Sequence, residues 1–214
     1  MTKLLKNICV LLVFLLTSHL VIAKEPIHLS QDNIKTLEKI ASTYNQYTLV
    51  KARFIQKDSL GNSAKGWLIL QKPGKARIEY ENIPVRFIAN KNVIMYQDIK
   101  LKQKSFVQTT SSPFGYLLEE HFSFFSPYFT ILNYSNNGSL IKITITSKKH
   151  PEMGQLTLYL ASLNAELIGW RILDAKGIIT EFYLNNPTFV KANLTDKSIF
   201  NMQRIVEKDF TDIK

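Results

Sequence analysis

The stretch GWLILQKPGKARIEYE, from Gly66 to Glu81, decides the fold that we expect for this chain. Two runs rich in apolar residues flank Pro73-Gly74, a pair typical of tight turns, so the stretch predicts a β-hairpin. Closing the hairpin across these two residues gathers one set of apolar side chains on a single face: Trp67, Ile69, Ala76, Ile78 and Tyr80. The opposite face then carries a mixed set: Leu68, Leu70, Arg77 and Glu79.

Alternating segments surround this hairpin on both sides. Apolar and polar residues alternate in most of them, which is typical of antiparallel sheets with one buried face. The segments expected to form strands are 50–57, 84–90, 93–98, 101–108 (the weakest of the first group), 140–147, 155–161, a hairpin over 167–184, and a last candidate near 198–202.

Two short helices accompany the strands. Ser30 is a suitable N-cap for a helix that ends near Tyr47. Apolar residues recur along this helix at helical spacing: Ile34, Leu37, Ile40, Ala41 and Tyr44. Ser112 followed by Pro113 predicts the start of a second helix. The aromatic-rich residues 122–134 give no clear prediction of local structure.

The expected fold class is therefore mainly β with short α. The apolar face of such a sheet must be buried against something. A second sheet, an interior packed by the chain's own side chains, or helices laid across a curved sheet would each bury it. Only the last arrangement can leave an apolar hollow, and the residues alone leave these alternatives open.

Residues 1–23 are predicted to be a cleaved signal peptide. Lys3 and Lys6 precede an apolar run over residues 8–16, and small residues favour cleavage after Ala23. The run is shorter than the ~20 residues that span a bilayer, and an uncleaved anchor is the alternative. Cys9, within the run, is the only cysteine, so we expect the exported chain to fold without disulfides.

Residues 24–204 are expected to form a single domain, followed by a charged C-terminal tail over residues 205–214. The formal net charge is +10, and lysine greatly outnumbers the five arginines. Proteins that read nucleic-acid sequence rely on arginine forks, so no nucleic-acid partner is expected for this exported chain. A lysine-rich surface favours anionic lipid head groups or acidic partners, or is simply solvated.

The sequence carries no recognisable catalytic motif and no metal-ligand spacing. His28, His121 and His150 are isolated from one another. Glu119, Glu120 and His121 are adjacent on a predicted helix, where neighbouring side chains point in different directions. We therefore expect no cofactor, no metal and no enzymatic activity. Two carboxylates brought together by the fold, as in a secreted hydrolase on a β scaffold, are the alternative.

The segment from Phe54 to Pro84 resembles the periplasmic outer-membrane lipoprotein carrier family, LolA. The family pattern runs F-x-Q, a polar loop with glycine, and then G-x-apolar-x-apolar-x-basic-P-G-x-x-R-apolar-x-Y. The residues that meet it are Phe54, Gln56, Gly61, Gly66, Trp67, Ile69, Lys72, Pro73, Gly74, Arg77 and Tyr80. The likeness extends more loosely over residues 30–202.

This resemblance implies an incomplete, open antiparallel β-barrel whose concave apolar face is covered by helices that act as a lid. It implies a periplasmic carrier that shelters the acyl chains of lipoproteins and moves them from the inner membrane to the outer membrane. The implied partners are acylated lipoproteins as cargo, an inner-membrane lipoprotein-releasing ABC transporter complex and an outer-membrane lipoprotein receptor. The carrier itself is expected to be a monomer.

The hairpin and the resemblance together suggest candidate site residues. For each apolar residue, the alternative to a role in ligand binding is ordinary packing in the core. Acyl chains are expected to contact the sheet at Phe54, Trp67, Ile69, Ile78 and Tyr80. The lid stripe is expected at Ile34, Leu37, Ile40, Leu117 and Leu118. Lys72 is expected to contact the lid, where relatives often have arginine, whose planar fork lysine lacks. Relatives also often have an aromatic residue in place of Ile78.

Two other functions compete with lipoprotein transport. The same hollow could bind free lipids, glycolipids or lipoprotein-like ligands, and the hydrolase alternative stays open until the fold shows whether carboxylates converge. An outer-membrane receptor of similar fold is disfavoured, because no lipidated cysteine follows the predicted signal peptide.

Overall fold

The computed structural model describes residues 27–194, 196–203 and 205. The predicted signal peptide lies outside these residues, as does all of the predicted C-terminal tail except Ile205. The described chain is mainly β, as expected. Its strands are β1 (Leu49–Asp58), β2 (Ser63–Gln71), β3 (Lys75–Tyr80), β4 (Val85–Asn90), β5 (Val93–Asp98), β6 (Gln103–Gln108), β7 (Phe129–Asn136), β8 (Leu140–Ser147), β9 (Gly154–Ala161), β10 (Leu167–Asp174) and β11 (Ile179–Val190).

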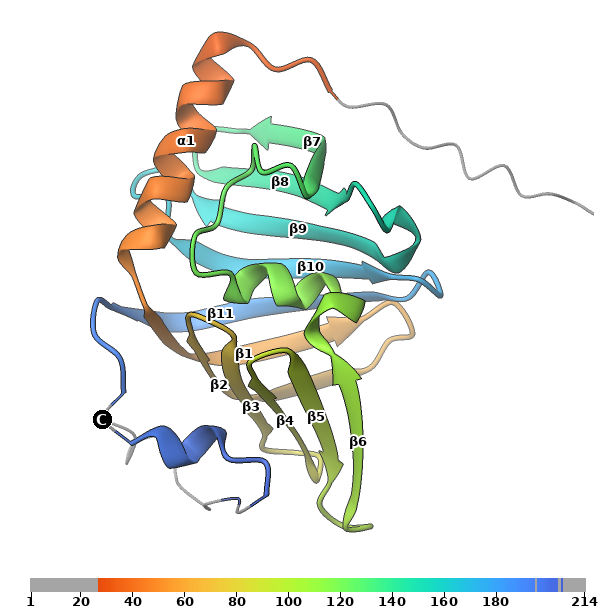
Figure 1. Cartoon of the computed structure of the whole chain (residues 1–214). Coiled ribbons are helices and arrows are strands. Elements are labelled where there is room, and N and C mark those ends of the chain that lie inside the picture. Colours follow the sequence, from red (N-terminus) through yellow and green to blue (C-terminus); the bar gives the residue numbers. More distant parts are fainter. Residues whose placement is uncertain (1–26, 195, 204, 206–214) are drawn as a thin grey trace, which may run out of the picture.

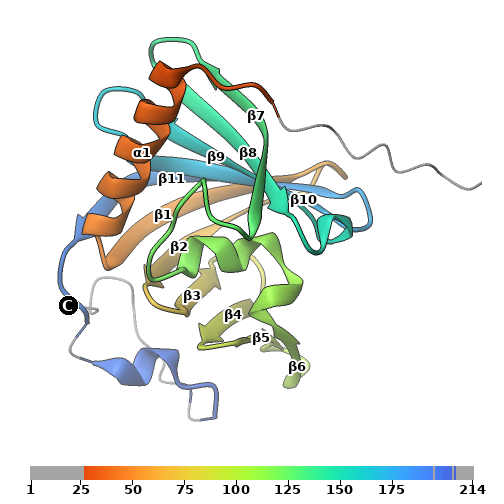
Figure 2. The same ribbon diagram turned by 45° about the horizontal axis from the view of Figure 1, so that its top comes forward.

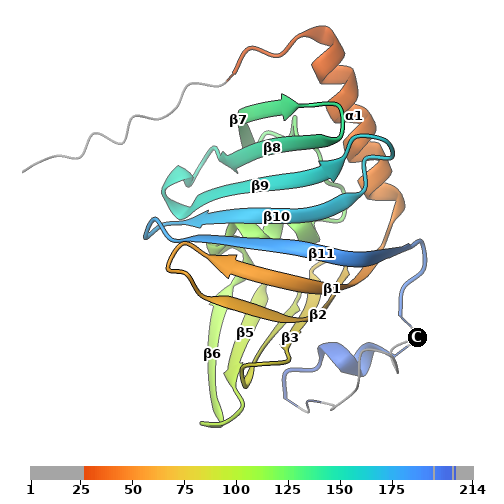
Figure 3. The same ribbon diagram turned by 180° about the vertical axis from the view of Figure 1, so that it is seen from behind.

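All these strands belong to one sheet of 11 strands, in the order β6-β5-β4-β3-β2-β1-β11-β10-β9-β8-β7. The strands of each half, β1 to β6 and β7 to β11, pair with their neighbours in sequence, and antiparallel pairing of β1 with β11 joins the halves. The edge strands β6 and β7 do not pair with each other, so the sheet curves without closing (Figures 1 and 3). The predicted open antiparallel barrel is therefore confirmed.

The described residues also form one α-helix and four 3-10 helices: α1 (Gln31–Gln46), η1 (Thr109–Ser111), η2 (Pro113–Leu118), η3 (Pro151–Met153) and η4 (Lys197–Phe200). Helix α1 begins as predicted, because the Ser30 hydroxyl accepts the main-chain N–H of Asn33 at 3.2 Å. Figures 1 and 2 show α1 and η2 on the same side of the curved sheet.

Two local predictions differ from the structure. The second helix starts at Pro113 behind its Ser112 cap, but it is a 3-10 helix that ends at Leu118. The candidate strand near residues 198–202 is wrong, since residues 197–200 form η4. The Asp196 carboxylate accepts the N–H of Ser198 at 2.9 Å, and this cap favours a helical turn over an extended strand.

The sheet separates two hydrophobic cores. The larger core lies on the concave face, between the sheet and the covering helices α1 and η2. The smaller core lies on the convex face and is covered by the C-terminal segment that contains η4. Its buried members are Leu49, Trp67, Ile69, Ile88, Met95, Leu194, Ile199 and Phe200.

Candidate functional site

The concave face is an apolar surface to which both halves of the sheet contribute. Side chains directly opposite each other on paired strands share a face, so the pairs Leu68–Ile78 and Leu70–Ala76 lie together. Strands β8 and β9 repeat the pattern in the other half, with Ile143 opposite Leu158. Because each of these side chains is buried in the same core, the concave face is the candidate surface for an apolar ligand.

Phe54 lies in a row of aromatic rings across the middle of this face. Its ring centroid is 5.3 Å from that of Tyr80 and 5.2 Å from that of Phe182. Phe182 in turn stacks on Trp170 at 4.8 Å. Phe54 and Ile78 are buried and Tyr80 is half-buried, so these three predicted site residues share the concave face. Trp170 and Phe182 were not predicted, although both lie in the predicted 167–184 hairpin, Trp170 before Arg171 and Phe182 after Glu181.

Trp67 and Ile69 do not lie on this face, and the prediction for these two residues is wrong. In the structure Gln71 pairs with Lys75, so the turn contains three residues, 72–74, instead of the two assumed from the sequence. A shift of one residue transfers a side chain to the other face of a sheet. Trp67 therefore pairs with Glu79 and Ile69 with Arg77, and both apolar residues belong to the convex core.

The predicted lid residues cover the concave face from two helices. Leu37 and Ile40 of α1 and Leu117 and Leu118 of η2 are buried in the concave core, whereas Ile34 is only half-buried. Together with the sheet side chains they form one buried apolar cluster. Of the alternatives that the sequence left open, the structure shows helices laid across a curved sheet (Figures 1 and 2).

The turn between β2 and β3 holds both covering helices. The ammonium nitrogen of Lys72 donates to the main-chain oxygen of Tyr44, near the end of α1, at 2.8 Å. Two residues later, the N–H of Gly74 donates to the oxygen of Leu118 in η2 at 2.9 Å. Gly74 has a φ of 68°, which favours glycine, and a Cβ there would lie 3.1 Å from the oxygen of Lys91.

Direct contacts between the two covering segments complete this arrangement. The Tyr44 hydroxyl donates to the oxygen of Leu117 at 2.6 Å. The Asn45 amide donates to the oxygen of Phe122 at 2.9 Å and accepts its N–H at 3.0 Å. We call the contacts of Lys72, Gly74, Tyr44 and Asn45 the latch. The latch joins α1, η2 and the turn of the sheet at one end of the concave face.

Burial changes the acid–base properties of the latch. Lys72 is only 7% exposed, and desolvation lowers the pKa of its amine to about 8. Its ammonium nitrogen lies 4.3 Å from the ring centroid of Tyr44, a distance at which the ring partly replaces water around the charge. Desolvation also raises the pKa of the Tyr44 hydroxyl, so this group keeps its proton well above neutral pH.

A pocket of about 430 Å³ opens beside the lid, between η2 and the β7–β8 edge. Phe129 and Tyr116 connect its wall to the concave core, while Glu119 and His150 lie at its polar side. Desolvation raises the pKa of the Glu119 carboxyl. The pocket marks a place where the interior comes close to the surface.

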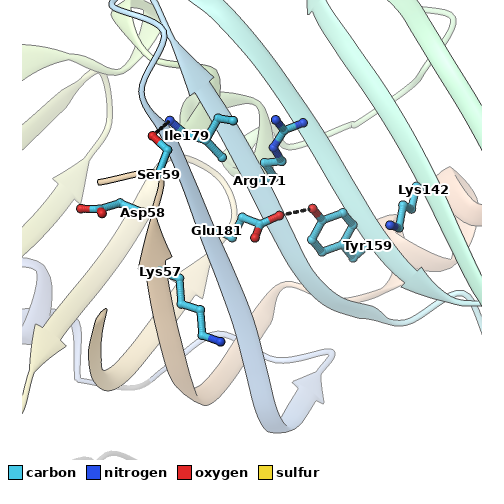
Figure 4. Close-up of a pocket in the computed structure, with 8 residues that line it drawn as sticks. All are labelled: Lys57, Asp58, Ser59, Lys142, Tyr159, Arg171, Ile179 and Glu181. Carbon is cyan, nitrogen blue, oxygen red and sulfur yellow. Dashed lines mark hydrogen bonds between the residues drawn. The ribbon is translucent and has the colours of Figure 1, made fainter. Parts of the chain in front are cut away.

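A different pocket, of about 450 Å³, lies on the convex face (Figure 4). Its central carboxylate, Glu181, accepts the hydroxyl groups of Tyr159 at 2.7 Å and Tyr183 at 2.9 Å. Burial alone would raise the pKa of Glu181, but these hydrogen bonds, with Arg171 and Lys142 nearby, lower it overall. The pocket is polar and open, and the thickness of the sheet separates it from the concave face.

Among the described residues, the buried polar and charged side chains are Gln71, Lys72, Arg77, Arg86, Thr109, Thr146 and Thr157, and none of these is a carboxylate. Within the part of the chain that the structure describes, no three His, Cys, Asp or Glu side chains are grouped to hold a metal ion. None of the helices over residues 27–194, 196–203 and 205 has the length and apolar character needed to cross a membrane.

Known proteins share this fold and sequence pattern. The family model for the outer membrane lipoprotein carrier protein LolA matches residues 45–203. An uncharacterized protein of Rickettsia prowazekii (strain Madrid E) is 29% identical over 147 residues, which are 67% of this chain and 64% of that protein. The match therefore spans less than two thirds of that relative.

Two solved structures align with much of this chain. A DUF1329 family protein from Desulfovibrio piger aligns with a TM-score of 0.50 at 7% identity, over 79% of this chain and 98% of its own. A LolA superfamily protein from Nitrosomonas europaea aligns with a TM-score of 0.44 at 8% identity, over 78% and 98%. At 7% identity the likeness to the Desulfovibrio piger protein concerns the fold alone. The family model matches more than half of the chain, over residues 45–203, and this chain belongs to the outer membrane lipoprotein carrier protein LolA family.

Proposed function

We propose that this protein is a periplasmic carrier that shelters the acyl chains of lipoproteins against its concave face and moves them from the inner to the outer membrane. Besides family membership, the observation that carries the proposal is that α1 and η2 cover a large apolar sheet face and are held at one end by the latch. Acyl chains would take the place of the lid side chains.

The energetics of this exchange are close to balance. Burying a side chain such as those of Leu37, Ile40, Leu117 and Leu118 is worth about 1.5–3 kcal/mol each, so lifting the four costs roughly 6–12 kcal/mol. Burying an acyl chain of about 15 methylene groups returns roughly 12 kcal/mol at ~0.8 kcal/mol per methylene. A nearly balanced exchange lets cargo bind and leave without an energy source at the release step.

The proposed contact residues on the sheet are Phe54, Ile78 and Tyr80, with Leu68 added because it lies directly opposite Ile78. Cargo would enter beside η2, where the pocket lined by Tyr116 and Phe129 approaches the interior. The proposed partners are an inner-membrane complex that loads the carrier and an outer-membrane receptor that unloads it, with the carrier acting as a monomer.

Site-specific photo-crosslinking tests this proposal. A benzophenone amino acid replaces Tyr80, which is half-buried on the concave face, or Tyr183, which lies on the convex face as a matched control. After incubation with acylated lipoprotein in inner-membrane vesicles, position 80 is expected to give an adduct with the lipoprotein and position 183 none. Adducts with small lipids alone would favour a free-lipid binding module. The absence of any adduct at position 80 in folded protein would contradict both functions.

A further inference from the structure

Three exposed aliphatic residues lie in two neighbouring turns at one end of the sheet. Ile83 in the turn between β3 and β4 is 40% exposed, and Ile99 and Leu101 in the turn between β5 and β6 are 38% and 61% exposed. We call these three residues the apolar tip. Figures 1 and 3 show the end of the β5–β6 hairpin projecting from the sheet on the side away from β7.

Hydrogen bonds give the apolar tip a defined shape. The N–H of Ile99 donates to the oxygen of Pro84 at 2.7 Å, which joins the two turns. The Asp98 carboxylate accepts the N–H of Leu101 at 2.8 Å, and Lys102 has a φ of 55°, so the turn presents Leu101 at its end. The exposure of these aliphatic groups is therefore a property of a built turn.

Basic side chains alternate with the aliphatic ones. Lys100 and Lys102 flank Leu101 on both sides, and both are exposed. Asp98, in the same turn, accepts the N–H of Leu101. Among the described residues neither Lys100 nor Lys102 forms an ion pair, so both can meet negative groups outside the protein.

This combination matches the interface of an anionic lipid bilayer. Aliphatic side chains enter the boundary between head groups and acyl chains, while lysine stems follow the apolar surface and keep their ammonium groups at the level of the phosphates. A protein partner would favour an aromatic or arginine anchor, whereas a projecting tip of Ile and Leu flanked by lysine suits a fluid surface. We propose that the apolar tip docks this protein on membranes that contain anionic phospholipids.

One short tip gives weak and reversible attachment, because it buries few apolar groups and uses few charges. This suits a protein that must leave the membrane again. The inference does not rest on the proposed cargo, since the tip lies outside the concave core and would act in the cargo-free protein.

Co-flotation with lipid vesicles tests the proposal. The processed protein, purified after export, is mixed with vesicles of phosphatidylcholine alone or with phosphatidylglycerol added. We expect binding only with phosphatidylglycerol, and a decrease with added salt. Leu101→Asp is expected to reduce binding to the level of pure phosphatidylcholine. Lys100→Gln and Lys102→Gln should each lower the partition coefficient roughly fivefold, as expected for one basic residue at an anionic surface.

Leu163→Asp is the matched control. Leu163 is 97% exposed at the turn between β9 and β10, and it has Asn164 and Glu166 nearby instead of lysines. This variant should float like the wild-type protein. Equal flotation of Leu101→Asp and wild type, or failure of wild type to bind either vesicle, would overturn the proposal. A Leu101→Asp defect in transfer to a purified protein acceptor, with unchanged flotation, would assign the tip to a protein partner.

Discussion

The ammonium nitrogen of Lys72 lies 2.8 Å from the main-chain oxygen of Tyr44, in a site where the lysine is almost fully buried. This contact links the β2–β3 turn to the end of α1, and Tyr44 continues the link to η2 through Leu117. The β2–β3 turn is therefore linked by hydrogen bonds to both elements that cover the concave face.

Lys72→Met tests the latch. The variant removes a hydrogen bond from a charged donor, worth about 1.5–3 kcal/mol, and also removes the desolvation of that charge. We expect the free energy of unfolding to change by less than about 1 kcal/mol because the two effects oppose each other. Hydrogen exchange of the last turns of α1 should become faster. Lys72→Arg, which keeps a charged donor, should restore slow exchange, and unchanged exchange in Lys72→Met would remove the residue from the latch.

The buried amine also predicts a dependence on pH. The pKa of Lys72 is lowered from its ordinary value of 10.5 to about 8, so between these values the folded protein binds fewer protons than the unfolded chain. The free energy of unfolding therefore increases with pH between about 8 and 10.5 through the titration of Lys72. The raised pKa of Tyr44 acts in the opposite direction above about pH 10, where the unfolded tyrosine ionises.

Urea denaturation at several values between about pH 7 and pH 9.5 measures this effect. Other titrating groups are common to wild type and Lys72→Met, so their contributions cancel in the difference. The wild-type protein should gain stability relative to the variant as the pH rises above 8. Parallel curves for the two proteins would show that the amine is not desolvated.

Glu79 neutralises two buried arginines on the convex face. Its carboxylate accepts Arg77 Nε at 2.8 Å and lies 3.5 Å from Arg86 Nε. Glu79→Gln removes one carboxylate from both cations and should lower the free energy of unfolding by about 3 kcal/mol in urea titration. The control is Glu81→Gln, whose partners Arg53 and Lys65 are exposed, with an expected loss below about 1 kcal/mol. Similar losses for both variants would contradict the burial argument.

Phe200 anchors the C-terminal segment on the convex core. Its side chain is buried beside Trp67 and Ile69, and Arg77 and Asn90 bind main-chain oxygens of Ile199 and Phe200. Phe200→Ala should cost about 3–5 kcal/mol of stability. In a Trp170→Phe background, the fluorescence of Trp67 should shift to the red as water reaches it. An unshifted spectrum would indicate that the segment does not depend on Phe200.

The sequence by itself determined most of the strands and the first helix, whereas β7 was not predicted and the open barrel followed from the family resemblance. Alternation with period two and helical spacing are local signals, and they were strong in segments such as 140–147 and in the stripe of Leu37 and Ile40. The family pattern over residues 54–84 is also local, and it indicated the fold without any knowledge of long-range contacts. The predicted contact of Lys72 with the lid came from the same resemblance.

Only the tertiary structure decided which residues share the concave face. The β2–β3 turn contains three residues instead of the two that we assumed, so Trp67 and Ile69 lie on the convex face. Side chains alternate between the two faces of a strand, and an error of one residue in register therefore places each of them on the wrong face. The second core, the packing of the C-terminal segment and the burial of Lys72 likewise depend on contacts between residues far apart in the chain. Such contacts leave no periodic signal, so a single sequence does not reveal them.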